Sequence, residues 1–384
     1  MLPLEGLKVL DLSRLLPGPY ASLVLADLGA RVDKVETPDG GDYLRHMPPL
    51  LGDESALFFA LNRNKRSVCL DLKAAQGPAA LLRMVRHYDV VLESFRPGVL
   101  TRLGCDWNAM RAQNGRLIYC AITGYGQEGP DAQAAGHDLN YIARAGVLGL
   151  GQQALGRATM PGGQMADVGG ALFGVIGILA ALEQRRRTGE GRFVDIAMAD
   201  AATAFAHMNL GAAWALGPQG ASTKAAGGPL NGGLAAYNIY PTLDGRQLAV
   251  AALEPKFFEG LCARLGRPDL IDGAYDVEGG GAASVRAALE DIFKTQALSH
   301  WLKVFEGADV CVEAVATTDE VFSNRQFAAR GLFTIDAAGR QMRTPLGEGP
   351  RPSVPAPKLG AHTREVLAEC GFSASEIDRI VAGA

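Results

Sequence analysis

The chain has 384 residues, of which 48% are hydrophobic and 20% are charged. This composition is typical of a globular protein with a sizeable core and excludes a largely disordered chain. Its 37 Lys and Arg residues against 41 Asp and Glu residues give a formal net charge of −4, so no overall basic field would hold a nucleic acid. We expect no nucleic-acid partner, and any anionic ligand must be bound by local groups.

Strand-like and helix-like segments alternate over the first third of the chain. Short apolar runs predict the strands, and the segments with helical spacing between them predict the helices. The expected strands are residues 8–12, 31–36, 67–72, 90–95 and 117–123, and the expected helices are residues 20–28 and 79–88. Strands separated by helices indicate a parallel sheet covered on both faces, which is a doubly wound α/β domain.

The chain changes character after residue 136. Helices are expected at 139–148, 168–187, 285–295, 299–305, 363–370 and 375–381, with one strand at 247–253. A Gly-, Ala- and Pro-rich stretch and a later Pro-rich stretch at 345–360 look like connections between domains. The predicted domains are 1–216 (N-terminal part of a large domain), 217–236 (linker), 237–330 (small domain) and 331–384 (linker and return to the large domain).

Targeting and membrane signals are not evident in the sequence. The most apolar stretch, residues 168–182, has 15 residues, fewer than the roughly 18 to 20 that span a bilayer, so we expect a buried helix and no membrane partner. The six cysteines include no CxxC pair and follow no signal peptide, which indicates reduced thiols and a cytoplasmic protein.

Several enzyme classes lose their strongest support because their motifs are missing. Residues 124–129 (GYGQEG) match GxGxxG, but Pro130 follows where a helix interior should begin, so we interpret them as a tight loop. The sequence has no phosphate-loop, HExxH or GxSxG motif. It has no Cys/His cluster with metal-ligand spacing either, so we expect no metal site.

Three polar positions stand in otherwise apolar or glycine-rich context. Asp138, after His137, is placed to cap the helix that follows, and Asp167 is placed to cap the apolar helix after it. Asp167 would then be held in its charged form by the helix dipole and free N–H groups, and could act as a base or a nucleophile. Glu254 lies between a strand and a helix. A capping role for each residue and a chemical role both remain open at this point.

Basic residues recur along the N-terminal domain, and several of them lie at the carboxyl ends of predicted strands. Open α/β sheets bind ligands at those ends, so a phosphorylated ligand would fit there, although solvated surface is the usual place for such residues. They are Arg14, Arg63, Lys65, Arg66, Lys73, Arg96 and Arg102.

These pieces, taken in order, resemble the family III CoA-transferase superfamily and, within it, the α-methylacyl-CoA racemases. The matching stretches cover the N-terminal two-thirds densely and the C-terminal third thinly. They are residues 9–32, 62–73, 90–104, 117–130, 136–141 (GHDLNY), 166–191 and 251–258 (AALEPKFF).

The resemblance implies a fold, a partner and a substrate. Its members have a Rossmann-like large domain built from both chain ends, a smaller inserted α+β domain, and two chains interlocked as a homodimer. The active site lies between large and small domains of different subunits. The substrate is an acyl-CoA, and coenzyme A is part of that substrate, so no separate cofactor is expected.

Residue roles follow from the same resemblance. Asp167 matches the aspartate shared across the superfamily, His137 matches the racemase histidine, and Glu254 matches the glutamate that pairs with it. The expected CoA contacts are Leu70, Asp71, Leu72, Lys73, Ser94, Phe95, Arg96, Arg102, Gly136, Asp138, Leu139, Asn140 and Tyr141, with the backbone of 136–141 included. Thr37 departs from the pattern, because racemases carry an arginine there; Lys34 or Arg66 is expected to compensate.

The implied reaction interconverts (2R)- and (2S)-2-methylacyl-CoA. Removing the α-proton and returning one to the opposite face needs two acid–base groups, here His137, oriented by Glu254, and Asp167. The backbone amide of Asp167 is expected to stabilise the enolate.

Two other functions remain open. In a CoA transferase, Asp167 would form an anhydride and then an aspartyl-CoA thioester, with no evident need for His137 or Glu254. A catalytically silent CoA-binding protein would bind CoA without α-proton exchange. The acyl group is not indicated by the sequence.

Overall fold

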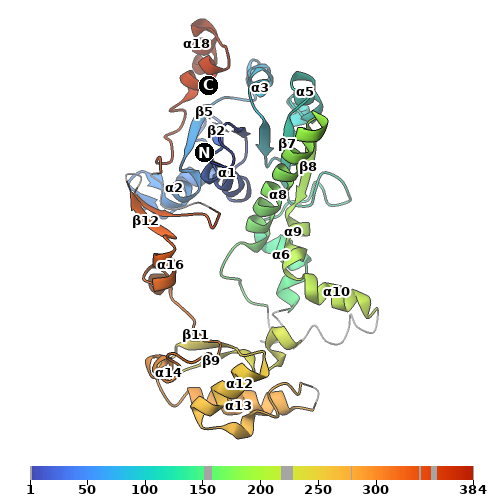
Figure 1. Ribbon diagram of the computed structural model, residues 1–384. Coiled ribbons are helices and arrows are strands. Elements are labelled where there is room, and N and C mark those ends of the chain that lie inside the picture. The colour runs from blue at the N-terminus through green and yellow to red at the C-terminus, as the bar shows by residue number, and fades with distance from the viewer. Residues whose placement is uncertain are drawn as a thin grey trace. The chain divides into compact units, whose positions relative to one another are not determined.

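The computed structural model describes residues 2–150, 158–217, 228–277, 279–336, 339–346 and 353–383 (Figure 1). The chain divides into two compact units. The first consists of Met1–Ala145, Gly162–Ala204 and Asn324–Ala384, and the second of Gly146–Pro161 and Phe205–Ser323. Parts of the two predicted connections, residues 218–227 and 347–352, lie outside the described residues. The predicted domain limits stay a prediction.

A six-stranded parallel sheet forms the centre of the first unit. Its strand order is β5-β2-β1-β6-β7-β8, and every neighbouring pair is parallel. The strands are β1 (Lys8–Asp11), β2 (Arg31–Glu36), β5 (Lys65–Cys69), β6 (Val90–Glu93), β7 (Ile118–Thr123) and β8 (Arg192–Ala197). The predicted parallel α/β sheet is confirmed, whereas β8 was not predicted. The order reverses between β1 and β6, which makes this the topological switch point.

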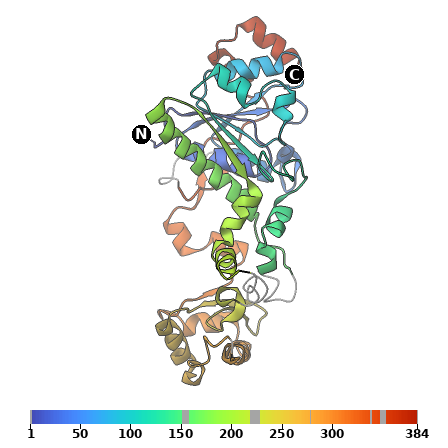
Figure 2. The same ribbon diagram turned by 90° about the vertical axis from the view of Figure 1, so that its right-hand side faces the viewer.

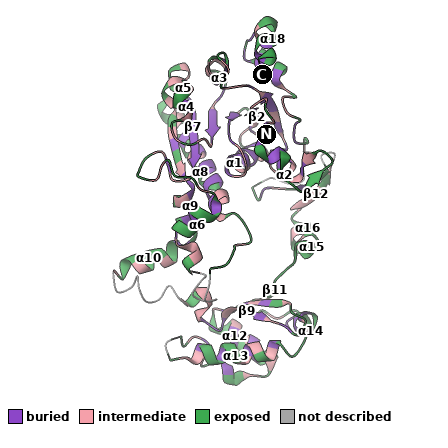
Figure 3. Ribbon diagram, turned by 180° about the vertical axis from the view of Figure 1, so that it is seen from behind, coloured by how far each residue is buried: buried purple, intermediate pink, exposed green. Residues whose placement is uncertain are grey.

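The strands are buried because helices cover both faces of the sheet (Figure 3). All six residues of β7 are buried. In β2 five of six residues are buried, including Asp33, Lys34 and Glu36. The interior position of β2 in the sheet leaves it no solvated face, so these charged side chains must be paired internally.

Helices α1 and α8 pack together, and α8 also contacts β7 and β8; Figure 2 shows α8 as the long green helix across one face of the sheet. The helices of this unit are α1 (Pro17–Asp27), α2 (Ala56–Asn62), α3 (Gly77–Val85), α4 (Val99–Arg102), α5 (Trp107–Gln113), α6 (Asp138–Arg144), α8 (Met165–Thr188), α9 (Met198–Phe205), α16 (Arg325–Ala329), α17 (Thr363–Glu369) and α18 (Ala374–Ala382). Four short strands also belong to it: β3 (Leu50–Leu51), β4 (Glu54–Ser55), β12 (Phe333–Asp336) and β13 (Gly339–Met342).

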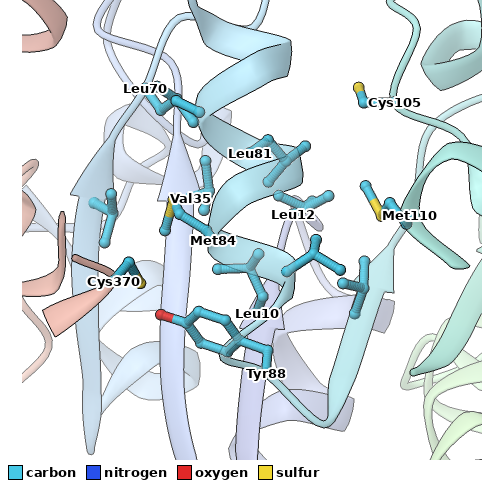
Figure 4. Packing of buried hydrophobic residues seen from close by; sticks show 14 of the residues in the cluster. Leu10, Leu12, Val35, Leu70, Leu81, Met84, Tyr88, Cys105, Met110 and Cys370 are labelled. Carbon is cyan, nitrogen blue, oxygen red and sulfur yellow. The ribbon is translucent and has the colours of Figure 1, made fainter. Parts of the chain in front are cut away.

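The core on the other face of the sheet joins distant parts of the chain. Leu10 and Leu81 pack in one cluster with Cys370 and with Val366 of α17 (Figure 4). Ion pairs support the same junction: Arg66 binds Asp33 of β2 and also Glu365 and Glu369 of α17. The C-terminal helices are therefore part of the large unit's core.

The second unit has its own antiparallel sheet and core. Its strand order is β11-β10-β9. Phe293 contacts the rings of Tyr240 and Trp301 in the centre of the helical layer. The elements are α10 (His207–Ala215), β9 (Tyr237–Pro241), β10 (Gln247–Ala251), α12 (Pro255–Leu265), α13 (Gly281–Phe293), α14 (Leu298–Val304), β11 (Val312–Ala314) and α15 (Thr318–Phe322).

Helix α8 is longer than the predicted apolar helix. It has 24 residues and, by length and composition alone, is apolar enough to cross a membrane, a test that core helices also meet. Half of its most apolar stretch is buried inside the chain, while Leu172, Phe173 and Ile176 are exposed. The absence of a membrane partner stays a prediction.

Candidate functional site

A cavity of about 690 Å³ lies at the carboxyl ends of β1, β6 and β7. It spans the switch point between β1 and β6, where doubly wound sheets bind their ligands. Eight of the residues predicted for the site line it: Ser94, Phe95, Arg96, Gly136, His137, Asn140, Tyr141 and Asp167. The structure therefore brings two of the three predicted catalytic residues and part of the predicted CoA contacts into one cavity.

Tight packing shapes the wall that carries His137. Tyr141 is buried, and its hydroxyl donates a hydrogen bond of 2.6 Å to the carbonyl of Gly136. A Cβ atom at Gly124 would lie 2.7 Å from the Tyr141 hydroxyl, and one at Gly136 would lie 2.6 Å from its ring. Glycine is therefore required at both positions. Residues 124–129 form a loop after β7, so the tight-loop interpretation is confirmed.

His137 is exposed and occupies the N-cap of α6. Its backbone N–H donates to Oδ1 of Asn140 (3.1 Å), and its carbonyl accepts from the N–H of Asn140 (2.8 Å). These bonds fix the backbone of His137 and leave its imidazole at the cavity.

Asp138 does not cap the helix that it begins, as the sequence suggested. Its Oδ1 instead accepts the backbone N–H groups of Ala166 (2.7 Å) and Asp167 (3.0 Å), which belong to the first turn of α8. Helix α8 begins at Met165, so Asp167 lies inside the first turn and is not the predicted N-cap. The bond between α6 and α8 fixes the backbones that carry His137 and Asp167 relative to each other.

The charged form of Asp167 is less favoured than the sequence suggested. Burial of its carboxyl, followed by the nearby charge of Asp138, raises its pKa to about 7. The helix N–H groups that should have stabilised the charged form are used by Asp138. For the same reason the backbone amide of Asp167 is not free to stabilise an enolate, and that expectation is corrected.

The remaining predicted CoA contacts do not line this cavity. Leu70 is buried in the hydrophobic core, so its side chain faces away from solvent. Asp71 accepts the N–H of Lys73 in a turn after β5 (2.8 Å). Leu72 packs partly buried against the core. Lys73, Arg102 and Leu139 are exposed.

The proposed compensation for Thr37 is contradicted. The Lys34 side chain is fully buried, with its ammonium 3.0 Å from Oδ2 of Asp42. Arg66 is used by Asp33 and by the two glutamates of α17. Neither cation is free to replace an arginine at a nucleotide.

Glu254 belongs to the second unit, where it is exposed at the N-cap of α12. Its predicted pairing with His137 stays a prediction. Within the described ranges, no group of three or more His, Cys, Asp or Glu residues is arranged to hold a metal ion.

Sequence reasoning missed several residues of the cavity wall. Tyr43, in the 3-10 helix Tyr43–His46, and Met198, at the start of α9, line it without any sequence signal. Arg14, named from the sequence among the basic residues near strand ends, also lines the cavity.

Comparison with known proteins gives a consistent result. The model of CoA-transferase family III matches residues 4–363. Alpha-methylacyl-CoA racemase of Homo sapiens is 36% identical over 388 residues, covering 97% of this chain and 95% of that protein. Succinyl-CoA:glutarate CoA-transferase of Mus musculus is 33% identical over 386 residues, covering 96% and 86%.

A solved structure is also similar to this chain over nearly its whole length. The CAIB/BAIF family protein from Brucella suis superposes with a TM-score of 0.83 at 31% identity, covering 96% of this chain and 99% of that chain. The match to the family model extends over nearly the whole chain, and the relatives exceed 30% identity over almost their full length. The chain therefore belongs to CoA-transferase family III.

Proposed function

We propose that the protein interconverts the (2R) and (2S) epimers of 2-methylacyl-CoA thioesters. The observation that carries the proposal is Asp167, a half-buried carboxyl in the cavity whose pKa is raised to about 7. At neutral pH such a group is partly protonated and partly ionised, so it can act as base toward one epimer and as acid toward the other. The 36% identity to an α-methylacyl-CoA racemase supports the same reaction.

In the proposed reaction, one group takes the proton from C2 as the C–H bond breaks, and the other donates a proton to the opposite face. Asp167 and His137, which line the same cavity, would serve the two faces. No proton is gained or lost overall, and the two groups end each turnover with exchanged protonation states. The enolate must be stabilised by donors other than the Asp167 amide, which Asp138 already accepts.

Binding of the substrate would rest on the CoA moiety. Arg96 lines the cavity, and the exposed Lys73 and Arg102 would contact phosphates nearby. Coenzyme A enters and leaves as part of the substrate. Glu254 would orient His137, as the family resemblance implies.

The quaternary structure and location are proposed on the same grounds. We propose an interlocked homodimer with a small inserted domain, in the cytoplasm. Interlocked chains cannot separate without opening a domain, so the dimer should persist on dilution. A monomer in sedimentation at micromolar protein concentration would exclude this topology.

A CoA transferase is the second candidate. Relatives of this activity are 33% identical over almost the whole chain, and Asp167 would be the acyl-accepting nucleophile. In that reaction the carboxylate attacks the thioester carbonyl and CoA leaves as the thiolate. CoA then attacks the acyl-enzyme anhydride at the aspartyl carbonyl, which releases the first acid.

One experiment separates the two candidates. A racemase incorporates solvent deuterium at C2 of both epimers of 2-methylbutanoyl-CoA and converts each to a mixture, without an added acid. A transferase moves CoA to an added carboxylate, and hydroxylamine traps its activated Asp167. Acceptor-dependent transfer without deuterium at C2 would exclude the racemase.

A further inference from the structure

The loop between β1 and α1, residues 13–16, is held in a strained conformation at the edge of the cavity. Leu15 has φ of 62°, a left-handed conformation that residues carrying a Cβ atom rarely adopt. Such a residue persists when its surroundings fix it. Gly18 supports the turn, because a Cβ atom there would lie 2.1 Å from the Ser13 side chain.

Buried charged side chains hold the backbone of this loop. The N–H of Leu15 donates to Oδ1 of Asp42 (3.0 Å), and the carbonyl of Ser13 accepts from Nζ of Lys34 (2.6 Å). Lys34 and Asp42 form an ion pair of 3.0 Å, and both side chains are fully buried. The N–H of Ser13 donates to Asp11, which is also fully buried (2.9 Å).

The residue that this loop presents to the cavity is Arg14. Its backbone N–H donates to Oγ of Ser94 (3.1 Å), which joins the β1 loop to the β6 loop across the switch point. Its guanidinium carbon lies 5.3 Å from the ring centroid of Tyr43 and 5.4 Å from that of Phe95, and Nη1 donates to the Tyr43 hydroxyl (3.3 Å). All four residues line the cavity.

Arg14 carries a charge without a countercharge. Within the described residues no carboxylate forms an ion pair with it, whereas Arg45, Arg63 and Arg66 in the same unit are each paired. Two aromatic faces position the guanidinium and leave N–H donors for a further partner. A half-buried cation of this kind, fixed at a cavity wall, matches a carboxylate or phosphate.

We propose that Arg14 binds an anionic group of the acyl-CoA substrate and that Lys34 and Asp42 are its positioning residues. This deepens the proposed function, because it requires an acyl-CoA ligand in the same cavity. The anionic group is a phosphate of CoA or a carboxylate at the far end of the acyl chain. In the second case Arg14 selects substrates that carry two carboxyl groups, one of them bound to CoA.

Equilibrium binding of inert thioethers tests the assignment without relying on catalysis. The probes are S-butyl-CoA, S-(3-carboxypropyl)-CoA and S-butyl-pantetheine, measured by calorimetry with the full-length protein and its Arg14→Gln variant. Losing a charge-assisted contact should weaken binding by about 10- to 100-fold. Weakening of both CoA thioethers, with unchanged pantetheine binding, assigns a phosphate. Weakening confined to the carboxylated probe assigns a carboxylate.

The matched control is Arg111→Gln. Arg111 also lies over an aromatic ring, that of Trp107, at 5.7 Å, but it is outside the cavity. The Arg111→Gln variant should bind all three probes as tightly as the unmodified protein does. The proposal would be overturned if Arg14→Gln bound every probe as tightly as the unmodified protein does. It would also be overturned if the variant bound all three probes, including the uncharged S-butyl-pantetheine, more weakly by the same factor. Missing deuterium exchange at C2 would instead refute the racemase and leave this result intact.

A second variant tests the positioning role. Asp42→Asn removes one of the carboxylates that face Lys34, while its Oδ1 can still accept the Leu15 N–H. The variant should weaken binding of the same probe whose binding Arg14→Gln weakens. Combining both changes should weaken binding little further, because both act through Arg14. Additive losses would show that Asp42 acts elsewhere.

Discussion

The two walls of the cavity use charge in opposite ways. The loop wall (residues 13–17, 43 and 94–97) rests on charges of opposite sign, Lys34 and Asp42, which are fully buried and paired. The second wall (residues 123–141, 167 and 198) carries Asp167, whose pKa is raised first by burial of its carboxyl and then by the nearby charge of Asp138. The buried ion pair fixes a geometry, whereas burial beside a like charge leaves Asp167 as a group that gains and loses a proton near neutral pH.

The largest effect is expected where a proton is moved. Asp167→Asn keeps the shape of the side chain but removes its acid–base function, so deuterium incorporation at C2 should fall by about 100- to 10,000-fold, and His137→Ala should act similarly. Proton NMR in deuterated water measures this rate. Binding of S-butyl-CoA is the control and should persist in both variants. If His137→Ala retains exchange while Asp167→Asn loses it, a single-base reaction replaces the two-base one.

The next effect concerns the stability of the loop wall. Burial lowers the pKa of Lys34, but Asp11 and Asp42 more than offset burial and the net shift is upward. Lys34→Met leaves Asp42 without its ion-pair partner, whereas Asp11 keeps Lys65. The loss should lower the free energy of unfolding by about 3–5 kcal/mol. Urea denaturation measures the change. Lys73→Met, at an exposed position, should leave the free energy of unfolding nearly unchanged. An equal loss of stability in Lys34→Met and Lys73→Met would mean that the buried pair has no special role.

A smaller effect is expected at Arg96 and Arg102, the proposed phosphate contacts. Arg96→Ala and Arg102→Ala should raise KM for acyl-CoA about 10- to 100-fold with little change in kcat, because a contact remote from C2 acts equally on bound substrate and transition state. Steady-state kinetics at low and high salt test this, and the effect should shrink at high salt if the contacts are exposed. A large fall in kcat with unchanged KM would contradict the assignment.

The smallest effect is expected at Asp138, whose charge contributes to the raised pKa of Asp167. Asp138→Asn removes a negative charge beside Asp167 while its amide oxygen can still cap α8, so the pKa of Asp167 should fall. The acidic limb of the pH profile of kcat/KM should then move to lower pH. Both reaction directions should move together, because the equilibrium constant between epimers does not depend on pH. Asp131→Asn, an exposed residue paired with Arg144, is the control and should leave the limb in place.

Much of the fold could be predicted from the sequence because local patterns specify it. Apolar runs separated by helical spacing predicted five of the six sheet strands and the parallel arrangement. The strand at 192–197 was missed, since its Arg and Asp residues interrupt the apolar run in RFVDIA. The start of α8 was missed because Met165 and Ala166 carry no capping signal of their own; Asp138 of α6 accepts the N–H groups of Ala166 and Asp167 instead.

The sequence predicted several residues that line the cavity, but not the contacts between them. Asp138 and Asp167 are 29 positions apart, so the bond between them depends on the packing of α6 against α8. Lys34 is a second residue whose surroundings the sequence did not predict. Its sequence position suggested a ligand contact, whereas its place in an interior strand buries it completely and makes it a structural cation.

The contribution of α17 and α18 to the first core has a consequence for synthesis in the cell. Leu70 and Leu81 leave the ribosome about 300 residues before Val366 and Ile377 against which their cluster is completed, a delay of roughly 15 to 60 s at typical translation rates. During that time the strands at the β5 edge have neither their final apolar cover nor the Arg66 ion pairs with Glu365 and Glu369. The nascent chain must therefore keep this edge from pairing with other chains until its last helices emerge.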